Sequence, residues 1–238
     1  MTRTAKHQEQ LIVALDGTSL DQAQELVELL REDVKNFEVG MELFTAAGPA
    51  VVEMIRRCGC HAFLDLKYHD IPSTVAKAIV AAAELGVTMI NLHASGGQRM
   101  MEESLHALER TMGPKRPKLV AVTVLTSLET LGDIGVQYEV REQVVRLAQM
   151  AKEAGLDGVT ASPMEIHSIR RACGKDFLIV TPGIRLIGEE AYDQRRIGSP
   201  RQAIESGADY LVVGRPITEA RDPRTVVHAF IAEIKAIS

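Results

Sequence analysis

Hydrophobic and polar positions follow two periods along this chain, and the two alternate from end to end. Short runs rich in branched apolar residues are typical of buried strands, and each is followed by a longer stretch with the apolar spacing of a helix. Eight strands are predicted, at residues 11–16, 36–40, 62–67, 88–94, 118–125, 158–162, 177–183 and 210–215. Such alternation favours a parallel α/β sheet over a β domain followed by an α domain.

Cap residues predict where several helices begin and end. Ser162-Pro163-Met164-Glu165 has the form of a capping box with proline at the first helical position. Ser199-Pro200 and Asp222-Pro223 repeat the polar cap followed by proline. Four glycines are expected just beyond helix ends: Gly86, Gly113, Gly155 and Gly207.

Eight βα units within 238 residues, of which 46% are hydrophobic, predict a single-domain (β/α)8 TIM barrel over residues 1–238. A doubly wound open sheet is the alternative on pattern alone. No linker, repeat or low-complexity tract divides the chain. The long polar segments 126–137 and 183–199 follow predicted strands and are candidate lids.

A net charge of −5, with acidic and basic residues interspersed, argues against nucleic-acid and membrane partners and favours a small-molecule substrate. No apolar run is long enough to span a membrane, and the polar residues 1–10 lack the apolar core of a signal peptide, so a cytoplasmic location is predicted. Cys58, Cys60 and Cys173 fit neither a disulfide framework nor a zinc site and are interpreted as ordinary thiols.

Polar side chains gather at the carboxyl ends of the predicted strands. Side chains alternate along a strand, so Phe63, Asp65 and Lys67 share one face while Leu64 and Leu66 share the other. The same count turns five further polar residues inward: Asp16, Glu38, Asn91, His93 and Arg215. Each alone also fits a structural role, and Asp65 with Lys67 also fits a surface ion pair. Together they predict a catalytic mouth, because active sites of this fold lie at that end.

The chemistry of Lys67 follows from its neighbours. An amine flanked by Asp65 and Asp70 is expected to stay protonated, so it suits a proton donor better than a Schiff-base nucleophile. A proton donor beside fixed negative charge suits a reaction that forms a carbanion after a negative group leaves, and decarboxylation is one such reaction.

A phosphorylated substrate is predicted from the last two strand ends. Gly214 and Arg215 close the eighth strand, and "TPGIR" (181–185) closes the seventh. Loops at these positions commonly bind phosphate through backbone N–H groups and a cation. "GGQRM" (96–100) is too short to indicate a nucleotide loop, and the chain has neither a Walker motif nor a dinucleotide fingerprint.

With these residues assembled, the chain resembles the orotidine 5′-phosphate decarboxylase family from residue 11 to residue 218. The most specific motifs are "DLKYHDIPST" (65–74) and the run "TPGIR", "DQRR" (193–196) and "ADYLVVGRPIT" (208–218). The resemblance implies conversion of orotidine 5′-phosphate to uridine 5′-phosphate, the last step of uridine monophosphate synthesis. It also implies a homodimer with shared active sites and no metal or organic cofactor.

The resemblance also assigns roles. Lys67 is expected to protonate C6 of the pyrimidine as carbon dioxide leaves, with Asp65 against the substrate carboxylate. Asp70 and Thr74 are expected to reach across the dimer into the neighbouring site. The expected substrate contacts are Asp16 with the ribose, Ser127 with the pyrimidine amide, Gln194 and Arg215 with the phosphate, and Pro182, Arg185 and Gly214 at the same two strand ends.

Glu38 departs from the family pattern, which has Lys-Val-Gly where this chain has Glu38-Val39-Gly40. With Asp65, Lys67 and Asp70, the change gives one positive and three negative groups instead of two and two. A charge pair at about 4 Å is worth roughly 4 kcal/mol at an effective dielectric near 20, so a loss of several powers of ten in rate is expected unless Glu38 takes up a proton.

Two alternatives stay open at this point. The first is a magnesium-dependent sugar-phosphate lyase, of the hexulose-6-phosphate synthase or ketogulonate-6-phosphate decarboxylase type, with Asp16, Glu38 and Asp65 as ligands. The second is a barrel that binds a phosphate ligand without turnover. "DIPST", "LTS" and "DQRR" favour the decarboxylase pattern.

Overall fold

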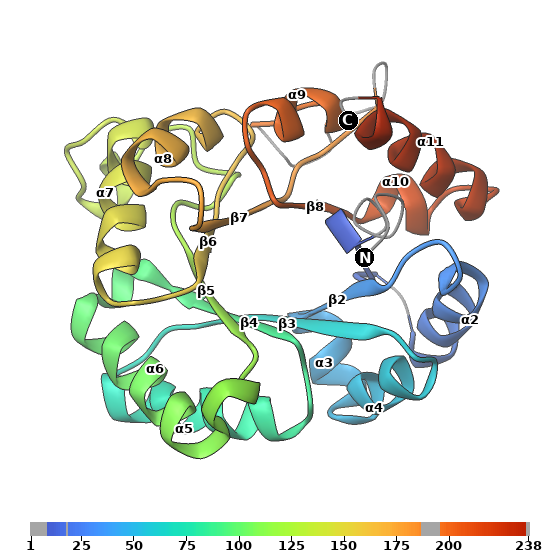
Figure 1. The fold of residues 1–238 in the computed structure, drawn as a ribbon, viewed down its shortest axis with the longest axis horizontal. Coiled ribbons are helices and arrows are strands. Elements are labelled where there is room, and N and C mark those ends of the chain that lie inside the picture. Colours follow the sequence, from blue (N-terminus) through green and yellow to red (C-terminus); the bar gives the residue numbers. More distant parts are fainter. Residues whose placement is uncertain (1–8, 18, 187–195, 237–238) are drawn as a thin grey trace.

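The computed structural model describes residues 9–17, 19–186 and 196–236. Its strands close into one parallel barrel in chain order, β1 to β8, with β8 paired to β1, and the helices lie around the outside of this ring (Figure 1). The strands are β1 (Leu11–Ala14), β2 (Asn36–Gly40), β3 (His61–Tyr68), β4 (Met89–His93), β5 (Lys118–Val122), β6 (Gly158–Thr160), β7 (Leu178–Thr181) and β8 (Tyr210–Val213). The predicted TIM barrel is confirmed, and the open sheet is excluded.

Helices follow the strands as the sequence predicts. The α-helices are α2 (Leu20–Leu30), α3 (Met41–Ala47), α4 (Ala50–Arg57), α5 (Pro72–Glu84), α6 (Gln98–Met112), α7 (Val140–Glu153), α8 (Ile166–Cys173), α9 (Pro200–Glu205), α10 (Arg215–Thr218) and α11 (Pro223–Lys235). Three short 3₁₀ segments are η1 (Ala94–Gly96), η2 (Gly113–Lys115) and η3 (Gly132–Ile134). Among the described helices, none is long and apolar enough to cross a membrane.

The apolar residues form two layers. A large outer layer packs the strands against the helices and includes Leu64, with Leu66 partly buried against it. A small inner layer fills the barrel and consists of Ile12, Ala14, Phe63, Met89, Val120, Val180 and Val212. This inner plug closes the barrel below the strand ends, so polar side chains above it face a cavity with an apolar floor.

The last helix is tied to the first part of the helix ring. Asp33, just after α2, accepts a hydrogen bond of 2.7 Å from Arg224 and lies 2.9 Å from the His228 ring nitrogen, both on α11. This contact joins segments nearly two hundred residues apart and completes the ring of helices. The single-domain organisation of residues 1–238 stays a prediction.

Most of the predicted helix boundaries are confirmed. Ser199 and Asp222 cap α9 and α11 by accepting hydrogen bonds from Gln202 and Thr225. Gly86, Gly113, Gly155 and Gly207 all follow helix ends with positive φ. Cys58, Cys60 and Cys173 are free thiols, as predicted.

The capping box predicted at Ser162 is wrong. The α8 helix begins at Ile166, and the Ser162 hydroxyl instead accepts a hydrogen bond of 3.2 Å from the Met164 N–H within a turn. The physical reason is that Glu165, which should complete the box, is engaged by Arg196 in an ion pair of 2.8 Å. A long-range charge pair thus replaces the local cap.

Candidate active site

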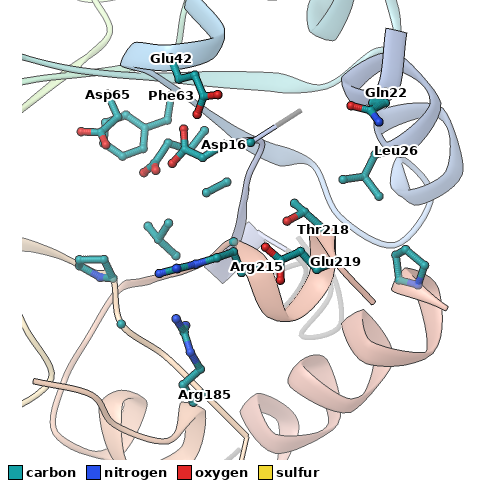
Figure 2. Close-up of a pocket in the computed structure, with 18 of the residues that line it drawn as sticks. Asp16, Gln22, Leu26, Glu42, Phe63, Asp65, Arg185, Arg215, Thr218 and Glu219 are labelled. Atoms are coloured by element: carbon teal, nitrogen blue, oxygen red, sulfur yellow. The ribbon is translucent and has the colours of Figure 1, made fainter. Parts of the chain in front are cut away.

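A cavity of about 700 Å³ opens at the carboxyl ends of the strands. Ten of its lining residues are labelled in Figure 2, where Asp65 and Asp16 lie on one side and Arg215 and Arg185 on the other. Residues from β1, β2, β3, β6 and β8 contribute side chains to this cavity. Within this one pocket the Asp16 and Asp65 carboxylates thus lie apart from the two arginines, and Glu219 lies beside Arg215 (Figure 2).

The end of β3 contributes both a carboxylate, Asp65, and an amine, Lys67, to the cavity. Phe63, Asp65 and Lys67 all line the cavity, as the alternation of the strand predicts. The Lys67 Nζ lies 2.5 Å from the Asp65 Oδ2, and the Asp65 side chain is only 11% exposed. A charge-assisted bond in such a partly buried place is much stronger than a surface ion pair.

The Lys67 amine stays protonated, as predicted. Burial alone would lower its pKa, but the Asp65 charge, the hydrogen bond to Asp65 and the charges of Glu38 and Asp16 together raise the pKa of Lys67 above its ordinary value. The ammonium form therefore persists through the neutral range. In this form Lys67 can donate a proton but has no lone pair for nucleophilic attack.

Glu38 and Asp16 place two further carboxyl groups near this pair. Glu38 is 6% exposed, and burial, followed by the charges of Asp65 and Asp16, raises its pKa well above the ordinary value. Burial and the Asp65 charge also raise the pKa of Asp16. Gly40 permits this packing, since a Cβ at that position would collide with the Asp16 carboxylate. The protonated form of Glu38 is thus favoured, with burial as the largest cause.

Replacing Glu38 with glutamine is expected to stabilise the protein at neutral and alkaline pH. A carboxyl group whose pKa is raised by folding contributes fully to the free energy of unfolding below its unfolded pKa of 4.5. This contribution is lost as the pH rises through the pKa of the folded state. Glutamine does not titrate, so its advantage should be absent below about pH 4 and grow as pH rises.

Urea unfolding of both proteins between about pH 4 and pH 9 measures this difference. Glu205→Gln, which removes an exposed carboxylate from α9, is the matched control. Parallel stability curves for Glu38→Gln and the original chain across that range would contradict the expected burial of a neutral Glu38.

The segments after β7 and β8 contribute two arginines to the cavity. Pro182, Arg185, Gly214 and Arg215 all line the cavity. Arg185 is 6% exposed, and its guanidinium donates a hydrogen bond of 2.8 Å to the Ile184 carbonyl. Two arginines with backbone N–H groups at a barrel mouth form a suitable environment for a phosphate.

Four of the residues that were assigned catalytic or substrate-binding roles do not line the cavity or lie outside the described residues. Asp70 and Thr74 are exposed and are not among the described residues that line the cavity. The Asp70 carboxylate accepts a hydrogen bond of 2.6 Å from the Ile71 N–H, and the carboxylates that raise the pKa of Lys67 are Asp65, Glu38 and Asp16, so a place for Asp70 beside Lys67 stays a prediction. Ser127 is exposed beside Thr126, which does line the cavity. Gln194 lies outside the described residues.

Arg196 is a residue whose role the sequence did not reveal. Its guanidinium donates to Glu165 at 2.8 Å and to the backbone carbonyls of Leu125 at 2.9 Å and Val124 at 3.2 Å. It therefore links the segment before α9 to the segment after β5 and to the start of α8. Arg196 and Glu165 are 31 residues apart, far beyond the spacings that helix or strand periodicity relates, so no sequence pattern indicates this pair.

The carboxylates do not make a metal centre. Within residues 9–17, 19–186 and 196–236, no group of three or more histidine, cysteine, aspartate or glutamate side chains is arranged to hold a metal ion. Asp16, Glu38 and Asp65, the ligands considered for magnesium, thus lack that arrangement.

Comparison with known proteins identifies a family that matches most of the chain. Residues 9–230 match the model of the "Orotidine 5'-phosphate decarboxylase / HUMPS family". Orotidine 5′-phosphate decarboxylase from Pelobacter propionicus is 54% identical over 228 residues, 95% of each chain, and that from Geobacter sp. (strain M21) is 51% identical over 230 residues, 95% of this chain and 96% of the relative. The crystal structure of orotidine 5′-phosphate decarboxylase from Lactobacillus acidophilus superposes with a TM-score of 0.83 at 39% identity, covering 95% of this chain and 99% of that one.

Proposed function

The chain belongs to the orotidine 5′-phosphate decarboxylase family, and from this premise we infer which of its residues carry the reaction. The reaction is the decarboxylation of orotidine 5′-phosphate to uridine 5′-phosphate. The observation that carries the assignment is the 2.5 Å contact between the Lys67 ammonium and the Asp65 carboxylate at the cavity mouth.

Lys67 is the acid in this proposal. The bond between C6 and the carboxylate carbon breaks, carbon dioxide leaves, and the electron pair stays on C6. That carbon takes a proton from the Lys67 ammonium, which becomes a neutral amine and is protonated again from solvent. The ammonium also stabilises the negative charge that develops on C6, without reorganisation at the moment of reaction.

Asp65 has two roles in the same proposal. Its carboxylate holds the Lys67 ammonium at 2.5 Å, and in this proposal it faces the departing carboxylate of the bound substrate. Two like charges at close range are unfavourable in the bound substrate, and this repulsion is relieved as carbon dioxide leaves. The pair thus favours the transition state over the ground state.

The phosphate binds at the opposite end of the cavity. We assign it to Arg215, Arg185 and the Gly214 backbone, with Pro182 shaping the wall beside them and Gln194 as a predicted further contact. Asp16 is assigned to the ribose hydroxyls, and Ser127 stays a predicted contact of the pyrimidine amide. Binding energy at the phosphate can then position C6 against Lys67.

The magnesium-dependent alternative is not favoured. The curated relatives are named for the decarboxylase, and within the described residues no three histidine, cysteine, aspartate or glutamate side chains are arranged to hold a metal ion. The predicted absence of a cofactor and the predicted cytoplasmic location remain predictions.

The first experiment follows the loss of orotidine 5′-phosphate ultraviolet absorbance with time, in the presence of magnesium and of a chelator. Turnover that is equal in the two conditions is expected, because protonation by Lys67 requires no metal. Turnover that disappears with chelator would contradict the metal-independent mechanism, and activity on sugar phosphates alone, in the presence of magnesium, would favour the sugar-phosphate lyase. An absence of turnover in both conditions, with tight binding of uridine 5′-phosphate, would favour a binding protein.

We further propose that two copies of the chain share their sites. Asp70 and Thr74 are exposed beside Ile71, which is 64% exposed, on the segment that follows Lys67. In this proposal Asp70 of the partner subunit completes the charge array around Lys67. An exposed apolar residue between two polar ones suits such an interface.

Mixing two inactive variants tests the shared site. Lys67→Ala and Asp70→Asn damage different residues, so a mixed dimer contains one site with both lesions and one intact site. After subunit exchange, activity should return to roughly a quarter of that of the original dimer. If Asp70 acts within its own chain, every site of the mixed dimer keeps one lesion and no activity returns.

A further inference from the structure

Lys67 has an unusual backbone that the decarboxylation chemistry alone does not explain. Its φ is 51°, and it is the single non-glycine residue with positive φ in the described part of the chain. This left-handed region is unfavourable for residues with a Cβ and persists only where the surroundings impose it. Something near Lys67 must therefore hold it in place.

The irregular pairing of β3 with β4 locates the cause. Leu64 pairs with Ile90 and Tyr68 with Leu92, so three residues of β3 lie opposite one residue of β4. That one residue is Asn91. The extra residues leave the regular ladder of hydrogen bonds, and the Lys67 N–H loses a backbone partner on the neighbouring strand.

The Asn91 side chain replaces the missing partner. Its Oδ1 accepts a hydrogen bond of 2.8 Å from the Lys67 N–H, and its Nδ2 donates to the Asp65 Oδ1. Only one orientation of the amide fits, because an N–H group requires the oxygen and a carboxylate requires the nitrogen. Asn91 is wholly buried, so both contacts are shielded from competing water.

These contacts link the two reacting groups through one side chain. Asn91 bonds to the backbone of Lys67 and to one oxygen of Asp65, whose other oxygen contacts the Lys67 Nζ at 2.5 Å. The three residues form a closed loop of hydrogen bonds at the end of β3. In such a loop, neither the ammonium nor the carboxylate can turn away without breaking a hydrogen bond that is at least partly buried.

We propose that Asn91 is a positioning residue of the decarboxylase site, which holds Lys67 in its left-handed conformation and orients the Asp65 carboxylate toward the ammonium. This inference rests on the proposed function of Lys67 and Asp65. Asn91 does not line the cavity among the described residues, so it acts through those two groups rather than on the substrate.

Two substitutions of Asn91 separate the effect of positioning Lys67 and Asp65 from the effect of the charge beside them. Asn91→Ala removes both contacts, whereas Asn91→Asp keeps an acceptor for the Lys67 N–H and places a carboxylate against Asp65. We expect both to lower kcat about a hundredfold, the loss typical of a displacement near 1 Å. We expect KM to change far less, because the arginines lie at the other end of the cavity (Figure 2).

The ammonium of Lys67 provides a readout that does not require turnover. The charged and titratable groups around it are Asp65, Glu38, Asp16 and His93. In Asn91→Ala the Asp65 carboxylate is free to turn away, so the pKa of Lys67 should fall, while in Asn91→Asp the added charge should prevent that fall. Nitrogen-15 NMR of the lysine side chains measures this titration, with the Lys67 signal assigned by its loss in Lys67→Ala.

The matched control is Thr123→Val. Thr123 is 4% exposed and donates from its hydroxyl to the Thr160 carbonyl at 2.9 Å, so this variant removes a buried bond of the same barrel without contact to Lys67. It should leave kcat and the Lys67 titration unchanged. Asn91→Ser carries the test if the alanine variant does not fold.

The outcomes distinguish this inference from the proposed function. A kcat and a Lys67 pKa that are both unchanged in Asn91→Ala would overturn the positioning role, as would a failure of all three Asn91 variants to fold while Thr123→Val folds. If the unsubstituted chain shows no decarboxylation but the Lys67 pKa responds as expected, the proposed function fails and the positioning role is supported.

Discussion

Replacing Lys67 with alanine is expected to lower the rate of decarboxylation by roughly 10⁴-fold or more while leaving phosphate binding nearly intact. The loss combines that of a general acid with that of a fixed charge beside the developing carbanion. Phosphate binding should persist because Arg215 and Arg185 lie on the far side of the cavity from Asp65 (Figure 2). Absorbance assays give kcat, and calorimetry with uridine 5′-phosphate gives the Kd.

Lys67→Arg separates the two contributions. Arginine keeps the positive charge but does not release a proton in proteins, so this variant should retain part of the electrostatic effect and lack the acid. Lys77→Ala, at an exposed position of α5, is the control for loss of a surface lysine. Near-normal turnover in Lys67→Ala would mean that the acid is another group.

The alternation of side chains explains why the β3 end could be predicted. A period of two placed Asp65 and Lys67 toward the cavity and Leu64 toward the helices, and the structure agrees. For Asp65, that inference requires only that the strand be regular as far as this residue. Beyond it, the bulge and the left-handed Lys67 were not predicted, because nothing in the sequence marks a lysine for that conformation.

Long-range contacts account for most of what the sequence did not reveal. Glu165 looked like the last member of a capping box, yet it pairs with Arg196, and the local rule failed because a buried charge requires a partner. Asn91 was correctly turned inward, but its two hydrogen bonds depend on the irregular pairing of β3 with β4. The periodicity of a sequence describes one helix or strand at a time, whereas these contacts depend on how two elements are placed relative to each other.

Glu38 shows how burial changes an argument based on formal charge. Counted from the sequence, the formal charges of the site are one cation, Lys67, and three anions, Asp65, Asp70 and Glu38. In the structure Asp70 does not line the cavity within one chain, and the pKa of Glu38 is raised by burial and by its carboxylate neighbours. At a pH where Glu38 is protonated, the site of a single chain therefore carries less negative charge than the formal charges of the sequence indicate.

Replacing Glu38 with lysine is expected to raise the rate of decarboxylation about a thousandfold. Where Glu38 is neutral, the substitution adds one positive charge beside the developing carbanion, worth roughly 4 kcal/mol at about 4 Å and an effective dielectric near 20. Where Glu38 is ionised, the substitution changes the charge at position 38 by two units. The gain in rate should therefore increase with pH. Asp16 and Asp65, which act on Glu38, can compensate the new ammonium.

Glu38→Gln is the control that separates charge from size. Glutamine stays neutral, so its rate should equal that of the original chain at low pH and exceed it as Glu38 ionises, yet remain well below that of the lysine variant. The kcat of all three proteins, measured across pH with magnesium and with chelator, tests this order. An equal or lower rate in Glu38→Lys would mean that the carboxyl at position 38 suits this chain's own site, and that the charge argument from the family pattern does not apply to it.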